Sequence, residues 1–303
     1  MSRSLPIILL ILIVTGANAQ QQPVLSQYMF HNHYFNPAYT GSALYDFSLI
    51  HRAQWSGYED YTGGKGAPVT QAFTATLNLD STGHGLGLTL SRDKTGLLNT
   101  FRAGISYAYR VPMTKKSTLA VGVRGGIESR SVDGSGYIVR HPDDPYIRAG
   151  DQRESKPDIT LGVWLDHEKY YVGVSSGSLV TRPDYKTLGT QNEENFMVTA
   201  GYHFILSGLL KLTPSAQVIT NTDRTLVQGG MMLLYDDFLW AGLYYRHEES
   251  ASMLAGFSFL EKKFRLGYAF DYIVRNKALK TGTSHEIMLQ YQVGTLSRAR
   301  RTK

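Results

Sequence analysis

The amino-acid sequence predicts an all-β fold, a transmembrane antiparallel β-barrel of about 14 strands preceded by a short N-terminal periplasmic segment. Three observations lead to this prediction. Apolar and polar residues alternate with period two through most of the chain. The alternating segments are as long as membrane-spanning strands, which need about 9 to 11 residues. Short and long connections between these segments follow one another in turn, as they do in outer-membrane barrels.

The composition agrees with a membrane barrel and excludes several other classes of protein. Charged residues make up only 18% of the 303-residue chain, below the roughly 25% of soluble domains. The chain contains no cysteine, which excludes disulfides, thiol nucleophiles and thiolate metal sites. The formal net charge of +6 comes largely from Arg3 and the C-terminal tail, so no nucleic-acid partner is expected.

The first 19 residues have the features of an export signal. Arg3 supplies a positive charge, residues 5–14 form an apolar run, and residues 17–19 read Ala-Asn-Ala, which is a small-residue cleavage site. We therefore expect cleavage after Ala19. Beyond this leader, no stretch approaches the run of about 18 apolar residues that a transmembrane helix needs.

Residues 101–111 illustrate the strand pattern. Phe101, Ile105 and Val111 share one parity with other apolar residues, whereas Arg102 shares the other parity with Gly, Ser, Ala and Arg. Such a pattern is typical of a strand with one apolar face. The same alternation predicts fourteen strands, at residues 43–56, 69–80, 84–93, 98–111, 117–131, 157–166, 169–178, 194–206, 209–222, 224–235, 237–248, 251–260, 263–275 and 283–294.

The connections predict how the barrel is oriented. If the first strand starts in the periplasm, every second connection is tight, as at residues 81–83, 207–208 and 261–262. The intervening connections include the long loops at residues 131–156 and 179–193, which are then extracellular. An even number of strands places both chain termini in the periplasm.

The polar parity favours a barrel lumen over a fully solvated surface. A secreted β-sandwich or a soluble barrel is the alternative fold, but its exposed faces would carry many Lys and Glu residues. Here the polar parity consists mainly of Gly, Ser, Thr and Ala, with an occasional Arg or Asp. Outer-membrane lipid is therefore expected around the apolar face.

No motif in the sequence indicates catalysis, a cofactor or a bound metal. His31, His33 and His51 lack any metal-ligand spacing. A hydrolase on the barrel wall would need a strand-borne histidine, but neither His203 nor His285 has a diagnostic partner sequence. We therefore predict a non-enzymatic protein with no cofactor and no metal site.

The segment at residues 26–41 is rich in aromatic side chains and lacks clean alternation. So much apolar area near a chain terminus must be buried against another surface. One interpretation is a plug packed on the periplasmic mouth of the barrel, the other is a docking surface for a partner, and the two are compatible. The candidate docking residues are Tyr28, Met29, Phe30, Tyr34, Phe35, Asn36, Pro37 and Tyr39.

Short motifs along the chain resemble those of one family. S-Q-Y-M-F at residues 26–30 and N-P-A-Y-T-G at residues 36–41 resemble the opening motifs of PorP/SprF-type outer-membrane proteins, which belong to the type IX secretion and gliding systems of Bacteroidota. Further matches follow in order, among them R-A-Q-W at residues 52–55 and S-H-E-I at residues 284–287. The sequence departs from the family pattern at the small insertion of residues 64–66 and in its arginine-rich tail.

The resemblance implies a non-enzymatic component of the outer membrane that binds surface proteins, such as large gliding adhesins, through their type IX C-terminal domain. The protein would anchor this cargo or help to export it. Implied partners are the cargo domain and periplasmic components of the secretion and gliding machinery. The extracellular loops would grip the cargo, with candidate contacts at Tyr137, His141, Asp143, Asp144, Tyr146 and Tyr185.

The expected organisation has four parts. A signal peptide at residues 1–19 precedes an N-terminal periplasmic or plug segment at residues 20–42, the barrel occupies residues 43–294, and a basic periplasmic tail follows at residues 295–303.

An outer-membrane porin or uptake channel for small or hydrophobic molecules is the alternative function. In that case charged side chains on the polar parity would line an open pore, and a steady conductance in a planar bilayer would distinguish the channel from a plugged anchor. The candidate pore-lining residues are Arg102, Arg110, Arg124, Arg265 and Asp271.

Overall fold

The computed structural model describes residues 24–58, 66–79, 83–133, 152–177, 179, 194–221, 224–275 and 282–295. Within these residues, a single antiparallel sheet contains 15 strands. The strands are β1 (Ala43–Ala53), β2 (Val69–Asn78), β3 (His84–Thr95), β4 (Leu98–Pro112), β5 (Ser117–Val132), β6 (Gln152–His167), β7 (Tyr170–Gly177), β8 (Asn195–Tyr202), β9 (Phe204–Ile205), β10 (Leu210–Thr220), β11 (Thr225–Tyr235), β12 (Leu239–Arg246), β13 (Ser250–Phe259), β14 (Phe264–Ile273) and β15 (Thr283–Thr295).

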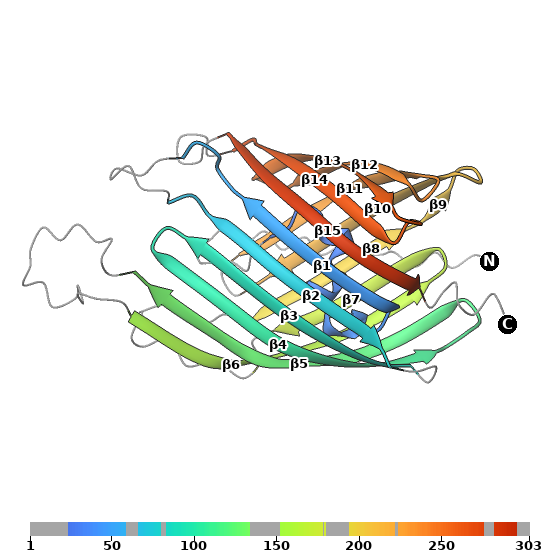
Figure 1. The fold of residues 1–303 in the computed structure, drawn as a ribbon, viewed down its shortest axis with the longest axis horizontal. Helices are drawn as coiled ribbons and strands as arrows, with labels where there is room; N and C mark the ends of the chain where they lie inside the picture. Colours follow the sequence, from blue (N-terminus) through green and yellow to red (C-terminus); the bar gives the residue numbers. More distant parts are fainter. Residues whose placement is uncertain are drawn as a thin grey trace, which may run out of the picture.

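The sheet closes on itself as a barrel (Figure 1). Neighbouring strands pair antiparallel, β1 pairs with β15, and β10 pairs with both β8 and β11. The short β9 adds two residues beside β10. The described residues thus form a closed barrel of 14 strands with one extra strand, which confirms the predicted fold class. Closure matters in a membrane because an open edge would leave main-chain N–H and C=O groups without partners in lipid.

The predicted strand at residues 194–206 is interrupted at His203. Strand β8 ends before this residue and β9 follows it. The N–H of His203 donates to the carbonyl of Lys169 at 2.6 Å, and its Nδ1 lies 3.0 Å from Oγ1 of Thr213. The register with β10 is the same on both sides of His203, so β8 and β9 continue one wall strand, as the sequence pattern predicts.

Strand β6 begins at Gln152, whereas the sequence pattern places its start at residue 157. Residues 152–156 read Gln-Arg-Glu-Ser-Lys and have no apolar parity, so alternation cannot detect them. They nevertheless pair with β5, from Gln152 opposite Val132 to Lys156 opposite Glu128. The loop expected at residues 131–156 is correspondingly shorter.

The two faces of the wall differ as the alternation predicts. On β1, the side chains of Asp46, Ser48, Ile50 and Arg52 are buried, whereas Leu49 between them is 53% exposed. Large apolar side chains are exposed on the outside of many strands, where they would meet lipid acyl chains. Examples are Ile105, Val121, Leu161, Val172, Leu233, Leu243, Met253 and Ile287.

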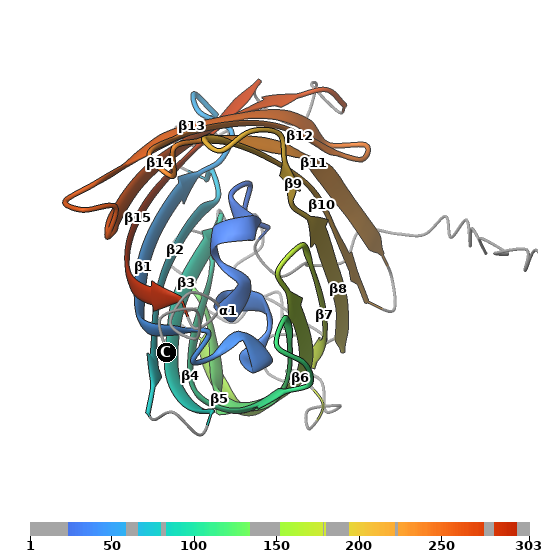
Figure 2. The same ribbon diagram turned by 90° about the vertical axis from the view of Figure 1, so that its right-hand side faces the viewer.

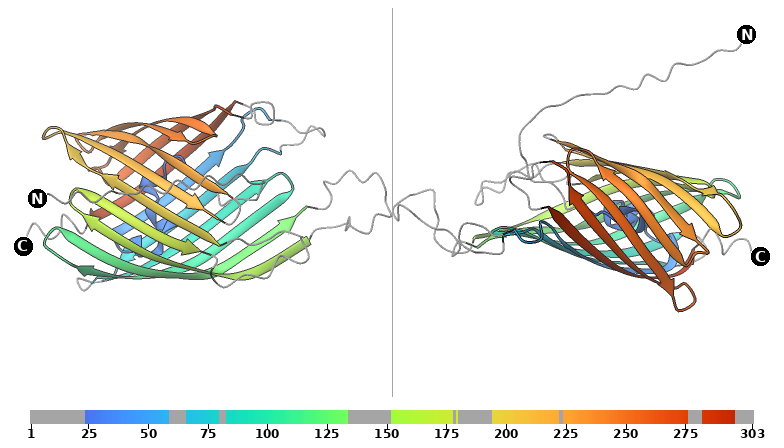
Figure 3. Two further views of the ribbon diagram at one scale, coloured as in Figure 1. Left: turned by 180° about the vertical axis from the view of Figure 1, so that it is seen from behind. Right: turned by 90° about the horizontal axis from the view of Figure 1, so that it is seen from above.

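Residues 24–42, which we call the plug, lie inside the barrel (Figure 2, Figure 3). They form three short turns of helix: η1 (Tyr28–Phe30), α1 (Asn32–Phe35) and η2 (Pro37–Tyr39). The plug runs lengthwise through the lumen. Its start, at Ser26, contacts Arg52 near the end of β1, and its end, at Gly41, accepts a hydrogen bond of 3.1 Å from Asn78 at the end of β2.

In the part of the chain that the structure describes, no helix combines the length and the hydrophobicity needed to cross a membrane.

Candidate functional site

The local sequence of the plug explains its helical turns. The N–H of Asn36 donates to the carbonyl of Asn32 at 2.8 Å, which closes α1. Asn36 then caps the next turn, because its Oδ1 accepts a hydrogen bond of 2.9 Å from the N–H of Ala38. Pro37 occupies the first position of that turn, where its fixed φ suits a helix and its missing N–H costs nothing. The N-P-A-Y motif is therefore a helix-start sequence.

The first half of the plug packs on the wall through an apolar cluster. Leu25 and Tyr28 are fully buried with Trp240 of β12 and Met288 of β15. The ring centroid of Phe30 lies 4.7 Å from that of Trp240. Burying a large apolar side chain contributes about 1.5 to 3 kcal/mol, so a few such residues hold this part of the plug in place.

The second half of the plug packs on a different part of the wall. Ala38 is buried with Ala120 of β5, Trp164 of β6 and Tyr171 of β7. The ring of Tyr39 lies edge-on to Trp164 at 5.0 Å, and Trp164 stacks on Tyr171 at 5.3 Å. The plug therefore bridges two sides of the lumen.

Glycines in the wall make room for the second half of the plug. A Cβ atom at Gly122 of β5 would lie 2.5 Å from the main-chain nitrogen of Ala38, and one at Gly162 of β6 would collide with Oδ1 of Asn36. Any larger residue at either position would therefore displace the plug.

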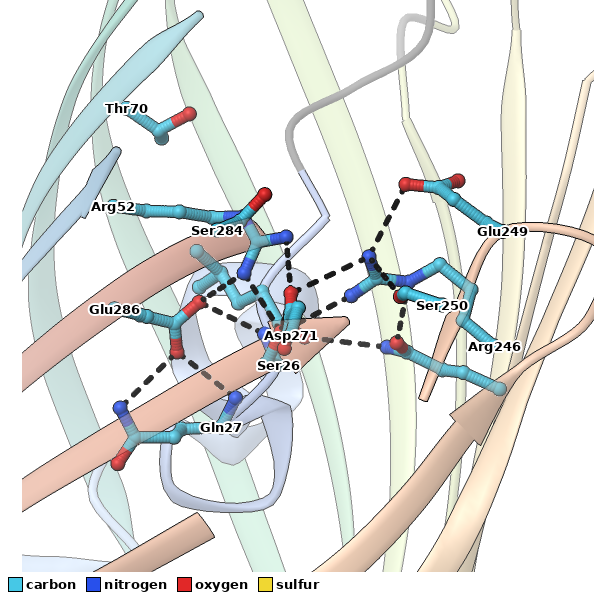
Figure 4. Close-up of polar contacts among 12 residues, drawn as sticks. Ser26, Gln27, Arg52, Thr70, Arg246, Glu249, Ser250, Asp271, Ser284 and Glu286 are labelled. Carbon is cyan, nitrogen blue, oxygen red and sulfur yellow. Dashed lines mark hydrogen bonds and ion pairs between the residues drawn. The ribbon is translucent and has the colours of Figure 1, made fainter. Parts of the chain in front are cut away.

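A buried group of charged and polar side chains ties the start of the plug to the wall (Figure 4). This ionic cluster consists of Ser26, Arg52 of β1, Arg246 of β12, Asp271 of β14 and Glu286 of β15. The Oγ of Ser26 donates to Oδ2 of Asp271 at 2.7 Å, and the N–H of Ser26 donates to Oε2 of Glu286 at 2.8 Å. Both arginines also donate to the Ser26 Oγ, Arg52 at 2.7 Å and Arg246 at 3.3 Å.

Ion pairs join the strand residues of the cluster to one another. Nη2 of Arg52 lies 2.6 Å from Oδ2 of Asp271, and Nη1 of Arg52 lies 3.2 Å from Oε2 of Glu286. Nη1 of Arg246 lies 3.9 Å from Asp271 and 3.3 Å from Glu249. Because each side chain of a buried pair has lost its water, removing one partner costs about 3 to 5 kcal/mol. The cluster therefore makes the position of the plug sensitive to any change of charge.

On the opposite wall, arginines bind the main chain of the plug. Nη1 of Arg110 donates to the carbonyl of Ala38 at 3.1 Å, and Nη1 of Arg124 donates to the carbonyl of Tyr34 at 2.9 Å. On the side of the ionic cluster, Arg265 of β14 instead meets a side chain of the plug, with its guanidinium carbon 5.9 Å from the ring centroid of Phe30.

The two remaining residues that were expected to line a pore also have partners. Arg102 pairs with Glu128 at 2.5 Å, and Asp271 belongs to the ionic cluster. All five of these residues therefore face inward as expected, and four of them contact the plug.

Two histidines of the plug are enclosed by hydroxyl groups. Nδ1 of His31 lies 2.9 Å from Oγ of Ser48, and Nε2 of His33 lies 3.2 Å from Oγ1 of Thr89. Burial lowers the pKa of both His31 and His33 to about 3, so both are neutral at physiological pH.

The three histidines considered for a metal do not converge. His51 lies on the outer face of β1, away from His31 and His33 of the plug. The described residues contain no group of three or more potential metal ligands.

The candidate docking residues all belong to the plug. Tyr28, Tyr34, Phe35, Asn36 and Pro37 are buried, and Met29, Phe30 and Tyr39 are partly buried. Their observed contacts are with the barrel wall, and docking of a partner stays a prediction. The candidate loop contacts lie outside the described residues, namely Tyr137, His141, Asp143, Asp144, Tyr146 and Tyr185.

Sequence reasoning placed Asp271 in the lumen but did not find the ionic cluster. Its other strand members, Arg52, Arg246 and Glu286, also lie on the polar parity of predicted strands. Charged residues at inward positions of separate strands were therefore the available signal. Their common partner, Ser26, lies outside any strand; it opens the S-Q-Y-M-F motif, but the motif does not indicate which residues it contacts.

The fold first defines the class of the protein: a β-barrel of the outer membrane, here with its N-terminal segment inside the lumen. The sequence then defines the family. Residues 17–291 match the family described as type IX secretion system membrane protein PorP/SprF, and the chain belongs to that family. This match confirms the resemblance seen in the short motifs and makes the protein an outer-membrane component of type IX secretion.

A solved outer-membrane protein, a hydrocarbon channel, shares the fold. The CymD monoaromatic hydrocarbon channel is 13% identical, with a TM-score of 0.50 over 86% of this chain and 91% of that chain. The toluene transporter TodX of Pseudomonas putida is 11% identical, with a TM-score of 0.46 over 84% of this chain and 90% of that chain. At such identities the likeness concerns the fold alone. No curated protein matches the sequence.

Proposed function

We propose that the protein is a plugged anchor that binds surface proteins, such as adhesins, through their type IX C-terminal domain and holds them at the cell surface or helps to export them. The observation that carries the proposal is the plug, which is bound to the wall by the ionic cluster at its start and by arginines and glycines further along. The membership of the PorP/SprF family supplies the secretion system to which this anchor would belong.

The attachment of the plug favours an anchor over a diffusion channel. A porin keeps a polar, water-filled lumen. Here the inward charges Arg110, Arg124 and Asp271 bind the plug. Moving the plug aside would break the hydrogen bonds of Ser26 to the buried ion pairs and expose the aromatic residues that pack on Trp240 and Trp164. Because the plug lies in the lumen, we expect partners to bind at the two rims of the barrel.

The proposed orientation gives each rim a partner. The tight connections and the basic tail at residues 295–303 would face the periplasmic components of the machinery. The longer connections, which contain residues 134–151 and 180–193, would face outward and meet the cargo domain. The even count of wall strands supports this arrangement, because it returns the C-terminus to the side on which the first strand begins.

Co-purification tests the proposal. A tagged protein is extracted from its own outer membrane in mild detergent, and companions are identified by mass spectrometry. The expected companion is a large surface protein with a type IX C-terminal domain. Replacing residues 134–151 by a short Gly-Ser linker is expected to reduce its recovery. A matched control changes the opposite rim, with Glu261→Asn and Lys262→Gly, two positions whose positive φ suits the new residues.

Two outcomes bear on the proposal, the first by narrowing it and the second by overturning it. One is full cargo recovery with the linker variant, which would remove residues 134–151 from the account of cargo binding. The other is recovery of a barrel without a companion that also conducts steadily in a planar bilayer, which would favour the diffusion channel.

A further inference from the structure

A groove lies on the outer wall of the barrel, over β15, β1, β2, β3 and β4, which run side by side in Figure 1. Its volume is about 480 Å³, within the range of about 300 to 1,000 Å³ that is usual for small-molecule sites. Leu49, Phe101 and Ile287, which line the groove, are exposed on the outside of the barrel. The groove therefore opens toward the surrounding membrane.

The strand register orders the groove into two rows of side chains. One row crosses five strands through successive paired residues, and it contains three polar members. It reads Ile287, His51, Gln71, Arg92 and Phe101.

The neighbouring row on the same face is apolar and reads Leu289, Leu49, Phe73 and Leu90. The groove thus has a polar edge beside an apolar floor. This arrangement complements an amphiphilic ligand, which has a polar and an apolar end.

The polar row lies near the ends of its strands. His51 is close to the end of β1 at Ala53, and Arg92 is close to the end of β3 at Thr95. Charged side chains on the lipid face of a barrel cost about 0 to 1 kcal/mol near the membrane interface, against about 2 to 4 kcal/mol at its midplane. Near the strand ends, an outward charge is therefore better tolerated than at mid-strand, and a lipid head group would be within its reach.

The charge of the polar edge is positive. Arg92 is exposed, and its Nε donates to Oδ1 of Asn99 at 2.8 Å, which fixes the guanidinium against the wall. Lys94, two residues further along the same face, is also exposed; it lies in the row next to the polar row and borders the groove without lining it. Its own row continues through Val69 and Ala53, so neither this row nor the polar row contains a carboxylate.

We propose that the groove binds a membrane lipid with a phosphate head group. Arg92 and Lys94 hold the phosphate, with His51 and Gln71 beside it, and an acyl chain lies over Leu49, Phe73 and Leu90. A guanidinium group forms strong charge-assisted hydrogen bonds with phosphate, and the apolar row supplies the contact area for the chain. We assign a lipid because a single molecule that fits both rows must carry a charged head group for the polar row and an apolar chain for the apolar row.

Native mass spectrometry of the detergent-purified full chain tests this proposal with two probes. Dioleoyl phosphatidic acid and dioleoylglycerol have the same acyl chains and differ by the phosphate group. The wild-type protein is expected to retain the phosphatidic acid and to retain little dioleoylglycerol. The double variant Arg92→Gln/Lys94→Gln is expected to bind phosphatidic acid about tenfold more weakly, because it loses the charged hydrogen bonds.

A matched control tests whether the loss of any positive charge on the outer face weakens binding, or only a loss at the groove. Arg153 of β6 is also exposed on the outer face, and its Nε donates to Oγ of Ser129 at 3.0 Å, but it lies outside the groove. Arg153→Gln is expected to leave phosphatidic acid binding unchanged. A second variant, Leu90→Trp, fills the apolar floor and is expected to weaken binding while leaving the charges in place. Heat-dependent gel migration verifies that each variant is folded.

Three results would overturn the proposal. The first is equal retention of both lipids by the wild-type protein. The second is equal loss of phosphatidic acid in Arg92→Gln/Lys94→Gln and in Arg153→Gln. The third is a dimer mass without bound lipid, which would assign this face to a second copy of the chain.

Discussion

The two halves of the plug meet the barrel wall by different chemistry. At its start, Ser26 binds charged side chains from β1, β12, β14 and β15. Further along, at Ala38, the wall approaches through the glycine at position 122 and through Arg110, which binds a main-chain carbonyl. The contact at Ser26 depends on the charges of the wall residues. The contact at Ala38 depends on the small volume of the wall residue and on the position of the plug main chain.

This difference shows how one segment is held at both ends without a regular secondary structure of its own. The charged side chains hold Ser26 at its depth in the lumen, because it bonds both carboxylates and both arginines at once. Glycine fixes the distance between plug and wall, because any Cβ at Gly122 would enter the space of Ala38. Changes of charge and of volume should therefore have separate effects on the two halves.

The largest expected effect comes from Asp271→Asn. This change leaves the buried guanidinium groups of Arg52 and Arg246 short of one carboxylate, so the free energy of unfolding should fall by about 3 to 5 kcal/mol. Urea titration of the protein in lipid vesicles measures the loss, and the fluorescence of Trp240, beside the first half of the plug, follows it.

The matched control for this variant is Asp236→Asn. Asp236 pairs with Lys262 at 3.1 Å, but both side chains are exposed, so the expected loss is about 0 to 1 kcal/mol. Equal losses in the two variants would show that the ionic cluster does not hold the plug.

A smaller effect is expected from Gly122→Ala. The new Cβ would lie 2.5 Å from the main-chain nitrogen of Ala38, and overpacking of this kind costs about 1 to 3 kcal/mol. Gly125→Ala, on the same strand, is the control, because no atom lies within 4 Å of its added Cβ. Urea titration compares the two. A change at Gly122 as mild as the one at Gly125 would contradict the close approach of the plug.

The smallest effect is a dependence on pH through His31. Its pKa is about 3 in the folded protein, against about 6.5 when unfolded, so the unfolded chain binds the proton first as the pH falls. The stabilising contribution of neutral His31 is complete above about pH 6.5 and is lost as the pH falls toward about 3. Between about pH 7.5 and 6, the loss should be about 1 kcal/mol.

Urea titration at the two pH values measures this effect. His31→Gln should reduce the difference, because glutamine does not titrate in this range. His247→Gln is the control, since the His247 side chain is 68% exposed. If His31→Gln and the wild-type protein lose the same free energy, the buried histidine is not the source.

The alternation of residues was enough to predict most of the wall. The strand expected at residues 98–111 is β4, Leu98–Pro112, because the environment of each side chain in a barrel wall follows from its own parity. The pattern failed where that rule does not apply. Residues 152–156 of β6 are polar on both faces and pair with β5 although they show no alternation.

The site was less predictable because its contacts are remote in sequence. Aromatic residues showed that the N-terminal segment is buried, but they did not distinguish the mouth of the barrel from its lumen. The partners Ser26 and Asp271 are 245 positions apart, and only barrel closure brings them together. Inward charges such as Arg52 and Glu286 indicated a polar interior without indicating which of them pair.

The pairing of Arg52 with Glu286 has a consequence for how the barrel assembles. These residues are register partners on β1 and β15, the first and last strands, which meet at the seam of the barrel. Joining the two ends of the chain carries a loop-closure entropy, which the contacts across the seam must offset. The seam charges bind Ser26 directly, so the closure of the wall and the docking of the N-terminal segment stabilise each other.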